Sequence, residues 1–170
     1  FIYDLKILKE NKIKLKSKNL PSLLLATSGS TGNPKVVKIT AENLISNTIN
    51  IIKCLNIDSN SKHITTLPIN YTYGLSCINT HLFSGATIVL NNSPVIQKDF
   101  WELMEQYKPN SISGVPYTYE LLYRLGIDKI NLKSIQTFTQ AGGKLSNEIL
   151  KYFADYCKNK NKEFIVMYGQ

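Results

Sequence analysis

A short loop rich in hydroxyl groups, residues 27–35, is the part of the sequence best suited to chemistry. It reads Thr-Ser-Gly-Ser-Thr-Gly-Asn-Pro-Lys and directly follows a short apolar run. Glycines let backbone N–H groups approach an anion closely, hydroxyl groups add short donors, and the lysine supplies a positive charge for phosphate oxygens. These residue types together predict a phosphate-binding loop.

Two other interpretations of this loop can be compared with the sequence. A Walker A loop requires Gly-x-x-x-x-Gly-Lys-Ser/Thr. Counted from Gly29, Pro34 stands where the second glycine would be and Val36 stands where Ser or Thr would be, which excludes that motif. An ordinary turn stays open on composition alone, because Gly, Ser, Thr, Asn and Pro are the commonest turn residues.

The order of residues in the loop is similar to the phosphate-binding signature Thr-Ser-Gly-Ser-Thr-Gly-x-Pro-Lys of the adenylate-forming enzymes. This superfamily includes acyl- and aryl-CoA synthetases, adenylation domains of nonribosomal peptide synthetases, and luciferases. Val36 is a departure, since the family usually has glycine there. The resemblance implies that Lys35 is a catalytic residue close to the phosphates. It also implies that the β- and γ-phosphates of ATP are wrapped by Thr27, Ser28, Gly29, Ser30, Thr31 and Gly32.

Four further segments resemble motifs of the same family, in the family's order along the chain. Residues 67–74 look like one wall of the acyl pocket, and residues 114–116 are similar to a Val-Pro-Pro helix start. Residues 140–145 occupy the place of the adenine-side loop, and residues 166–170 resemble the strand-end motif Tyr-Gly-x-Thr-Glu. The resemblance implies a nucleotide site that includes Ala141, Gly142, Gly143, Tyr168, Gly169 and Gln170. It implies an acid pocket lined by Tyr71, Thr72, Tyr73 and Gly114.

The reaction implied by the resemblance is ATP-dependent activation of a carboxylic acid to an acyl-adenylate, with release of pyrophosphate. Transfer to the thiol of CoA, or of phosphopantetheine on an acyl carrier protein, would follow. The glutamate that helps hold Mg²⁺ in the family would lie beyond residue 170, so no metal ligand is assigned here. Because the family's enzymes are several hundred residues long, we expect the 170 residues to be an internal part of the large N-terminal domain. We expect this part alone to be inactive.

The class of acid is suggested by Thr72. Adenylation domains for α-amino acids usually place an Asp at the corresponding position, where it pairs with the substrate ammonium. A hydroxyl cannot replace that charge, and a buried unpaired ammonium is costly. The sequence therefore favours a fatty or aryl acid, with an amino-acid adenylation domain as the alternative within the family.

The charge balance of the chain suggests other partners. Lys and Arg number 20 against 12 Asp and Glu, which gives a net charge of +8. Such a balance fits nucleic acid, an anionic membrane surface or a phosphorylated ligand. Arg124 is the one arginine, and the aromatic residues are not interleaved with the lysines, so the contacts that nucleic-acid readers use are poorly supplied. A basic binding module is the alternative from another functional class.

Cysteine and histidine usage indicates a reduced protein. Cys54, Cys77 and Cys157 are far apart and odd in number, and His63 and His81 fit no metal-binding motif. No apolar run reaches the roughly 20 residues of a membrane-spanning helix, and no signal segment is recognisable. We expect a cytoplasmic protein with no metal held by these histidines.

The elements that would position the site follow from an alternation of short apolar runs with longer segments of helical periodicity. Strands are expected at residues 23–27, 35–39, 63–67, 86–90, 111–115, 137–139 and 164–167. Helices are expected at residues 41–55, 73–82, 97–107, 116–124 and 146–157, with Thr40 and Ser146 as N-caps. This order predicts one α/β body over residues 1–170, with a mainly parallel sheet and helices on both faces. Ligands of such sheets bind at the carboxyl ends of the strands.

Overall fold

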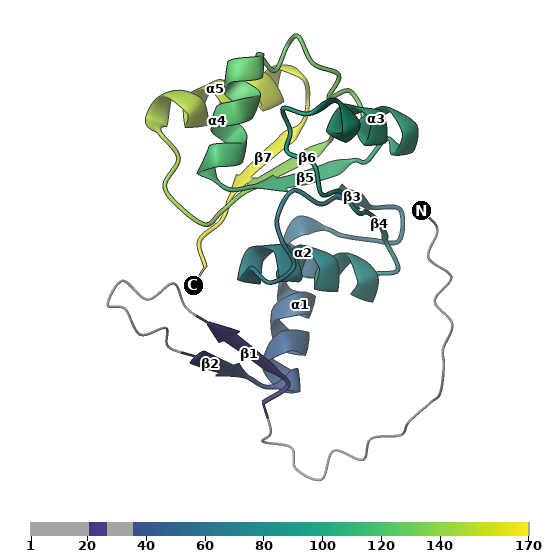
Figure 1. Cartoon of the computed structure of the whole chain (residues 1–170), viewed down its shortest axis with the longest axis vertical. Helices are drawn as coiled ribbons and strands as arrows, with labels where there is room; N and C mark the ends of the chain where they lie inside the picture. The colour runs from purple at the N-terminus through teal and green to yellow at the C-terminus, as the bar shows by residue number, and fades with distance from the viewer. Residues whose placement is uncertain (1–20, 27–35, 170) are drawn as a thin grey trace. The chain divides into compact units, whose positions relative to one another are not determined.

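A computed structural model describes residues 21–26 and 36–169 (Figure 1). The chain divides into two compact units, residues 1–44 and 45–170, and each is described by itself. In the first unit, β1 (Leu23–Ala26) and β2 (Val36–Ile39) form an antiparallel ladder that pairs Leu23 with Ile39. Both strands were expected from the sequence. The organisation of residues 1–170 as one body stays a prediction.

Helix α1 (Ala41–Leu55) has the bounds that the sequence predicts. Its start is fixed by two reciprocal hydrogen bonds. Thr40 Oγ1 accepts from the backbone N–H of Asn43 at 3.2 Å, and Asn43 Oδ1 accepts from the backbone N–H of Thr40 at 3.2 Å. These bonds satisfy donors that the first turn of a helix leaves free, which confirms Thr40 as the N-cap.

The second unit is built on a five-stranded parallel sheet with the order β4-β3-β5-β6-β7. Its strands are β3 (Lys62–Ile64), β4 (Thr87–Val89), β5 (Ser111–Gly114), β6 (Thr137–Gln140) and β7 (Glu163–Val166). The helices between them are α2 (Thr72–Phe83), α3 (Lys98–Tyr107), α4 (Pro116–Leu125) and α5 (Asn147–Asn159). The predicted α/β fold with a mainly parallel sheet is confirmed, and each helix bound lies within about two residues of its expected position.

The direction of winding reverses between β3 and β5. From β3 the chain passes through α2 to β4, and then it returns through α3 to β5 on the other side of β3. Because parallel crossovers are right-handed, this reversal places α2 on one face of the sheet and α3, α4 and α5 on the other (Figure 1). Open α/β sheets bind ligands at such a reversal, outside the carboxyl ends of the strands.

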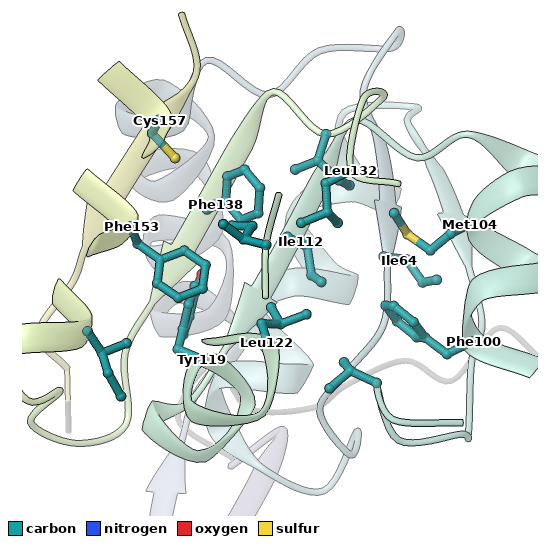
Figure 2. Packing of buried hydrophobic residues seen from close by; sticks show 14 of the residues in the cluster. Ile64, Phe100, Met104, Ile112, Tyr119, Leu122, Leu132, Phe138, Phe153 and Cys157 are labelled. Carbon is teal, nitrogen blue, oxygen red and sulfur yellow. The ribbon is translucent and has the colours of Figure 1, made fainter. Parts of the chain in front are cut away.

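The apolar core lies on the side of the sheet covered by α3, α4 and α5. Ile64, Ile112 and Phe138 point into it from three adjacent strands, and each is at most 1% exposed. Figure 2 shows them with residues of the surrounding helices. The rings of Tyr119 and Phe153 meet edge to face with centroids 4.9 Å apart. Burial of these large side chains is the main force that holds the helices on the sheet.

Strand β3 ends at Ile64, earlier than the expected 63–67. The next two residues use their hydroxyl groups as backbone partners. Thr65 Oγ1 accepts from the backbone N–H of Asn91 at 2.8 Å, and Thr66 Oγ1 donates to the carbonyl of Ser113. Threonine side chains that bind the backbone compete with a regular ladder, which explains the early end. No helix among the described residues is long and apolar enough to cross a membrane.

Candidate active site

The sheet face turned toward α2 is polar, although the opposite face is apolar. Side chains alternate between the two faces along a strand, so Ile112 and Phe138 face the core while their neighbours face α2. These neighbours are small hydroxyl residues, namely Ser111, Ser113, Thr137 and Thr139. Strands covered on both faces are usually apolar throughout. A hydroxyl-rich face on covered strands therefore marks a candidate site.

A cavity of about 120 Å³ lies against this polar face. The sheet contributes His63 and the four hydroxyl residues, and Met167 follows β7 at the cavity wall. Helix α2 contributes Tyr73, Ser76, Cys77, Thr80 and His81, and the segment 51–57 contributes Ile51, Leu55, Asn56 and Ile57. Ser61, Asn110 and Gln136 complete the lining, which falls wholly within the described part of the second unit and contains no Asp, Glu, Lys or Arg.

A chain of hydrogen bonds runs along the cavity wall from α2 to the sheet. Tyr73 Oη lies 2.7 Å from Thr139 Oγ1, which lies 2.8 Å from Ser113 Oγ. Cys77 Sγ donates to Ser113 Oγ at 3.2 Å. Burial raises the pKa of the Tyr73 hydroxyl above its ordinary value and raises the pKa of the Cys77 thiol to about 11. Both groups are therefore protonated and uncharged at neutral pH.

The two histidines of the chain meet at the cavity. Their rings are 4.7 Å apart between centroids, and Nδ1 of His63 lies 3.1 Å from Ser111 Oγ. Nδ1 of His81 donates to the carbonyl of Cys77 at 2.8 Å. Burial lowers the pKa of His63 to about 3, with a smaller contribution from His81, and burial lowers the pKa of His81 as well. Both rings are neutral at physiological pH, so the lining formed by the described residues carries no charge.

Of the four pocket residues inferred from the sequence, the structure places Tyr73 in the cavity lining. Tyr71 precedes α2 and Thr72 is its first residue, and both side chains are exposed. Gly114 ends β5 and faces α4, where an added Cβ would lie 2.9 Å from Thr118 Cβ. The structure therefore does not bring Tyr71, Thr72 or Gly114 into the lining of this cavity.

Ser113 and Thr139 are the site residues that the sequence motifs missed. Their signal is the alternation of hydroxyl and apolar side chains in 111–114 and 137–140. Only the pairing of β5 with β6 sets them side by side, because Ser113 is the Cα partner of Thr139.

The expected adenine-side loop lies against the segment expected to form the pocket wall. Gly142 has a φ of +81°, and a Cβ at this position would collide with the Tyr71 hydroxyl and lie 3.0 Å from Val115 Cγ1. Glycine is therefore required both for its backbone conformation and for the close approach of Tyr71. The backbone N–H of Ala141 donates to the carbonyl of Gly114 at 3.2 Å, which extends the pairing of β5 and β6.

The remaining nucleotide-side residues divide between the described and the undescribed parts of the chain. Gly143 packs against the Pro116 ring, where an added Cβ would lie 3.1 Å from Pro116 Cγ. Tyr168 and Gly169 follow β7 at the carboxyl end of the sheet, and the Tyr168 side chain is 90% exposed. The other residues of the inferred site lie outside the described residues, namely Thr27, Ser28, Gly29, Ser30, Thr31, Gly32, Lys35 and Gln170.

Comparison with known families identifies the chain. A family model described as AMP-binding enzyme matches residues 5–170. This chain belongs to the AMP-binding enzyme family. The family resemblance stated from the loop and strand-end motifs is thereby confirmed.

Individual relatives within this AMP-binding family are distant. Acetyl-coenzyme A synthetase 1 of Candida albicans is 27% identical over 158 residues, which cover 88% of this chain and 23% of that protein. The putative acyl-CoA synthetase YngI of Bacillus subtilis is 28% identical over 153 residues, which cover 85% of this chain and 26% of that protein. The chain thus spans about a quarter of the length of these curated relatives.

A solved structure shows the same fold. The structure of McyG A-PCP complexed with phenylalanyl-adenylate matches with a TM-score of 0.77 at 18% identity. The match covers 90% of this AMP-binding chain and 26% of that one. This likeness shows a shared fold, and the placement of the chain within a large N-terminal domain stays a prediction.

Proposed function

We propose that the protein carrying this chain activates a carboxylic acid with ATP and then transfers the acyl group to a thiol. The first step forms an acyl-adenylate and releases pyrophosphate, and the acceptor is CoA or the phosphopantetheine arm of a carrier protein. Membership in the AMP-binding enzymes supports adenylation, and the two curated relatives are named as CoA synthetases. The observation that carries the proposal is the cavity, whose lining joins Tyr73 of the expected pocket wall to Met167 beside the expected nucleotide motif.

The assignment of roles follows the order of the motifs along the chain. A carboxylate oxygen of the acid attacks the α-phosphorus of ATP, and pyrophosphate leaves. Catalysis of such a step consists mainly of positioning and charge stabilisation. In the proposal, residues 27–32 and Lys35 hold the β- and γ-phosphates, and residues 141–143 with residues 168–170 form the adenine side. The exposed ring of Tyr168 offers a flat face on which a base could stack.

Magnesium accompanies ATP in the proposed reaction and would neutralise part of the phosphate charge. No described residue is assigned to the ion, because the carboxylate expected to hold it would follow residue 170. The proposed steps for this chain therefore concern binding and orientation of ATP and the acid.

The acid is proposed to lack an α-amino group, and a fatty or aryl acid is favoured. Two observations support this choice. By the resemblance, Thr72 stands where amino-acid adenylation domains place the carboxylate that pairs with the ammonium. The described cavity lining, which does not include Thr72, contains no carboxylate either. An ammonium buried here without a partner would be strongly disfavoured. An amino-acid adenylation domain remains the alternative.

The test is acid-dependent exchange of pyrophosphate into ATP, measured on the protein at its full encoded length. We expect exchange with at least one acid and a preference for a deaminated acid over the matching amino acid. Preference for the amino acid would favour the peptide-synthetase alternative. Absence of exchange with every acid, together with salt-sensitive nucleic-acid binding and no effect of ATP on thermal stability, would favour the basic binding module.

Two related proposals concern the extent and place of activity. We expect the 170-residue chain alone to show no exchange, and appreciable exchange by it would contradict this.

We propose that the protein acts in the cytoplasm. All three cysteines are free, with Cys77 and Cys157 buried, which supports a reducing compartment.

A further inference from the structure

We propose that the cavity beneath α2 selects a short acid whose uncharged tail carries a hydrogen-bonding group, such as a hydroxyl. This inference rests on the proposed function and narrows its substrate. It names Ser113 and Thr139 as the residues that determine specificity.

The size of the cavity limits the tail. Its volume is about 120 Å³. For scale, an engineered apolar cavity of roughly 150 Å³ holds one benzene molecule. The cavity therefore has room for about one small ring or a chain of a few carbons. A long-chain fatty acid, with a dozen or more methylene groups, would extend beyond the described cavity.

The polarity of the walls selects against a plain hydrocarbon tail. Ile51, Leu55, Ile57 and Met167 supply apolar surface at the cavity. The facing sheet surface consists of hydroxyl groups and the neutral His63 ring. Ser111, Ser113 and Thr137 each already bond to a neighbouring side chain. A hydrocarbon tail would therefore leave unpaired only a donor that the wall does not itself use, and such a desolvated donor is costly. A tail with its own polar group avoids this cost.

The hydrogen-bond chain has one donor more than it uses. Tyr73, Thr139, Ser113 and Cys77 carry one O–H or S–H proton each, and three contacts join these four groups. Three contacts use three protons, so one proton remains for a partner outside the chain. Because all four groups line the cavity, an acceptor oxygen on a bound tail can receive it.

The charge of the lining excludes two further classes of acid. Among the described residues, the lining contains no Lys or Arg to pair with a second carboxylate and no Asp or Glu to pair with an amine. The two histidines are neutral, and the tyrosine and cysteine are protonated. A charged tail would therefore be buried without a counter-ion, which the cavity geometry cannot compensate.

The experiment compares matched acids in pyrophosphate exchange by the full-length protein. One pair is 4-hydroxybutanoate and pentanoate, and a second is 3-hydroxybenzoate and 3-methylbenzoate, so that each pair differs by a hydroxyl in place of a methyl. Hexadecanoate and glutarate test the limits on length and charge. We expect kcat/KM for at least one hydroxylated acid to exceed that of its methyl partner about tenfold or more, with neither hexadecanoate nor glutarate used.

Variants connect this preference to the named residues. We expect Ser113→Ala and the isosteric Thr139→Val each to reduce the hydroxyl-to-methyl preference about tenfold while the methyl-bearing acid is still used. Ser84→Ala is the matched control, because the Ser84 hydroxyl is buried outside the cavity without a hydrogen-bond partner among the described residues. Thermal unfolding establishes whether each variant is folded. If one of the two cavity variants does not fold, the other alone tests the inference.

The outcomes separate this inference from the proposed function. Acid-dependent exchange with equal use of both members of each pair, or with hexadecanoate preferred, would overturn the inference and leave the proposed function standing. An unchanged preference in both cavity variants would also overturn it. Absence of exchange with every acid would overturn the proposed function itself.

Discussion

The hydroxyl of Tyr73 lies 2.7 Å from Oγ1 of Thr139, and this contact joins the first turn of α2 to β6 across 66 residues of sequence. It places a residue from the expected pocket wall beside one that no motif indicated. The contact also links the two sides of the reversal in winding, since α2 leads toward β4 while β6 lies beyond β5. The cavity wall thus runs along the α2 face of the sheet, from Ser61, Asn110 and Gln136 before the strands to Met167 after β7.

Removal of this contact tests its contribution to stability. We expect Tyr73→Phe to lower the free energy of unfolding by about 1 kcal/mol, because a half-buried hydrogen bond is lost while the ring keeps its packing. Thermal or urea unfolding measures the change. Tyr117→Phe is the matched control, since the Tyr117 side chain is 64% exposed, and it should change nothing measurable. Equal stability of both variants with the parent would show that the bond contributes little.

The fold could be predicted where its causes are local. The bounds of α1 follow from Thr40 as a cap and from apolar periodicity, and both are visible in the sequence. The early end of β3 could not be predicted, because Thr66 binds a carbonyl at Ser113 that is distant in sequence. The strand order depends in the same way on pairing between remote segments.

The candidate site shows the same division. Tyr73 could be inferred because it belongs to a contiguous motif, whereas Ser113 and Thr139 lie in separate strands and become neighbours through the β5–β6 register. Individually, a serine or threonine in a short strand is unremarkable. Their alternation with Ile112 and Phe138 shows a polar face, but only the position of α2 makes that face the wall of a cavity.

The close approach of Tyr71 and Gly142 gives a second prediction. We expect Gly142→Ala to destabilise the protein by about 1–3 kcal/mol, because the φ of +81° is strained for alanine and the new Cβ would collide with the Tyr71 hydroxyl. Thermal unfolding measures the loss. The same substitution should lower pyrophosphate exchange if this loop borders the nucleotide.

A matched glycine separates the two causes of that loss. Gly85 has a φ of +68°, but the nearest atom to an added Cβ is the Ser59 Cβ at 4.0 Å. Gly85→Ala should therefore show the backbone strain without the collision. We expect it to be the milder substitution, and we expect Tyr71→Phe to recover part of the stability lost in Gly142→Ala. No difference between the two alanine variants would argue against a steric role for Tyr71.

The buried His63 predicts a pH dependence of stability. Its folded pKa of about 3 is depressed below the ordinary value of 6.5, so between these values the unfolded state binds a proton that the folded state does not. Stability is therefore present above about pH 6.5 and is lost as the pH falls. The slope for one such group approaches about 1.4 kcal/mol per pH unit. His81 adds to the effect in the same direction, because its pKa is also lowered.

The free energy of unfolding, measured between pH 7.5 and 5, reports this effect. Most carboxyl groups titrate below this range and therefore contribute little to the decline. We expect His63→Asn, whatever its own stability, to show a flatter decline than the parent, because the amide does not titrate. The groups that face His63 in the cavity are His81, Tyr73 and Cys77, and neither of the latter two changes charge in this range. A decline of unaltered slope in the variant would show that His63 is not its source.

Lys162 predicts a further contribution to stability. Its ammonium group donates to the carbonyls of Leu132 and Lys133, each at 3.2 Å, and to that of Ile135. One side chain thus holds the loop that precedes β6. We expect Lys162→Met to lower the free energy of unfolding by about 2 kcal/mol, since it leaves these carbonyl oxygens without the donor. Lys160→Met, at an exposed neighbouring lysine, is the control and should leave the unfolding midpoint unchanged.

Lys35 tests the proposed role of the loop that the sequence analysis began with. If its charge binds phosphate oxygens of ATP, Lys35→Ala should lower kcat/KM for ATP about tenfold or more, as expected for loss of a hydrogen bond to a charged group, while the KM for the acid changes little. Lys38→Ala is the matched control, because Lys38 is an exposed lysine nearby on β2 and is not part of the inferred site. Pyrophosphate exchange measured at varied concentrations of ATP, and separately at varied concentrations of the acid, distinguishes an effect on ATP use from an effect on acid binding. An equal change in Lys38→Ala would attribute the effect to general positive charge. An ATP dependence unaltered by Lys35→Ala would rule out a phosphate contact at this position.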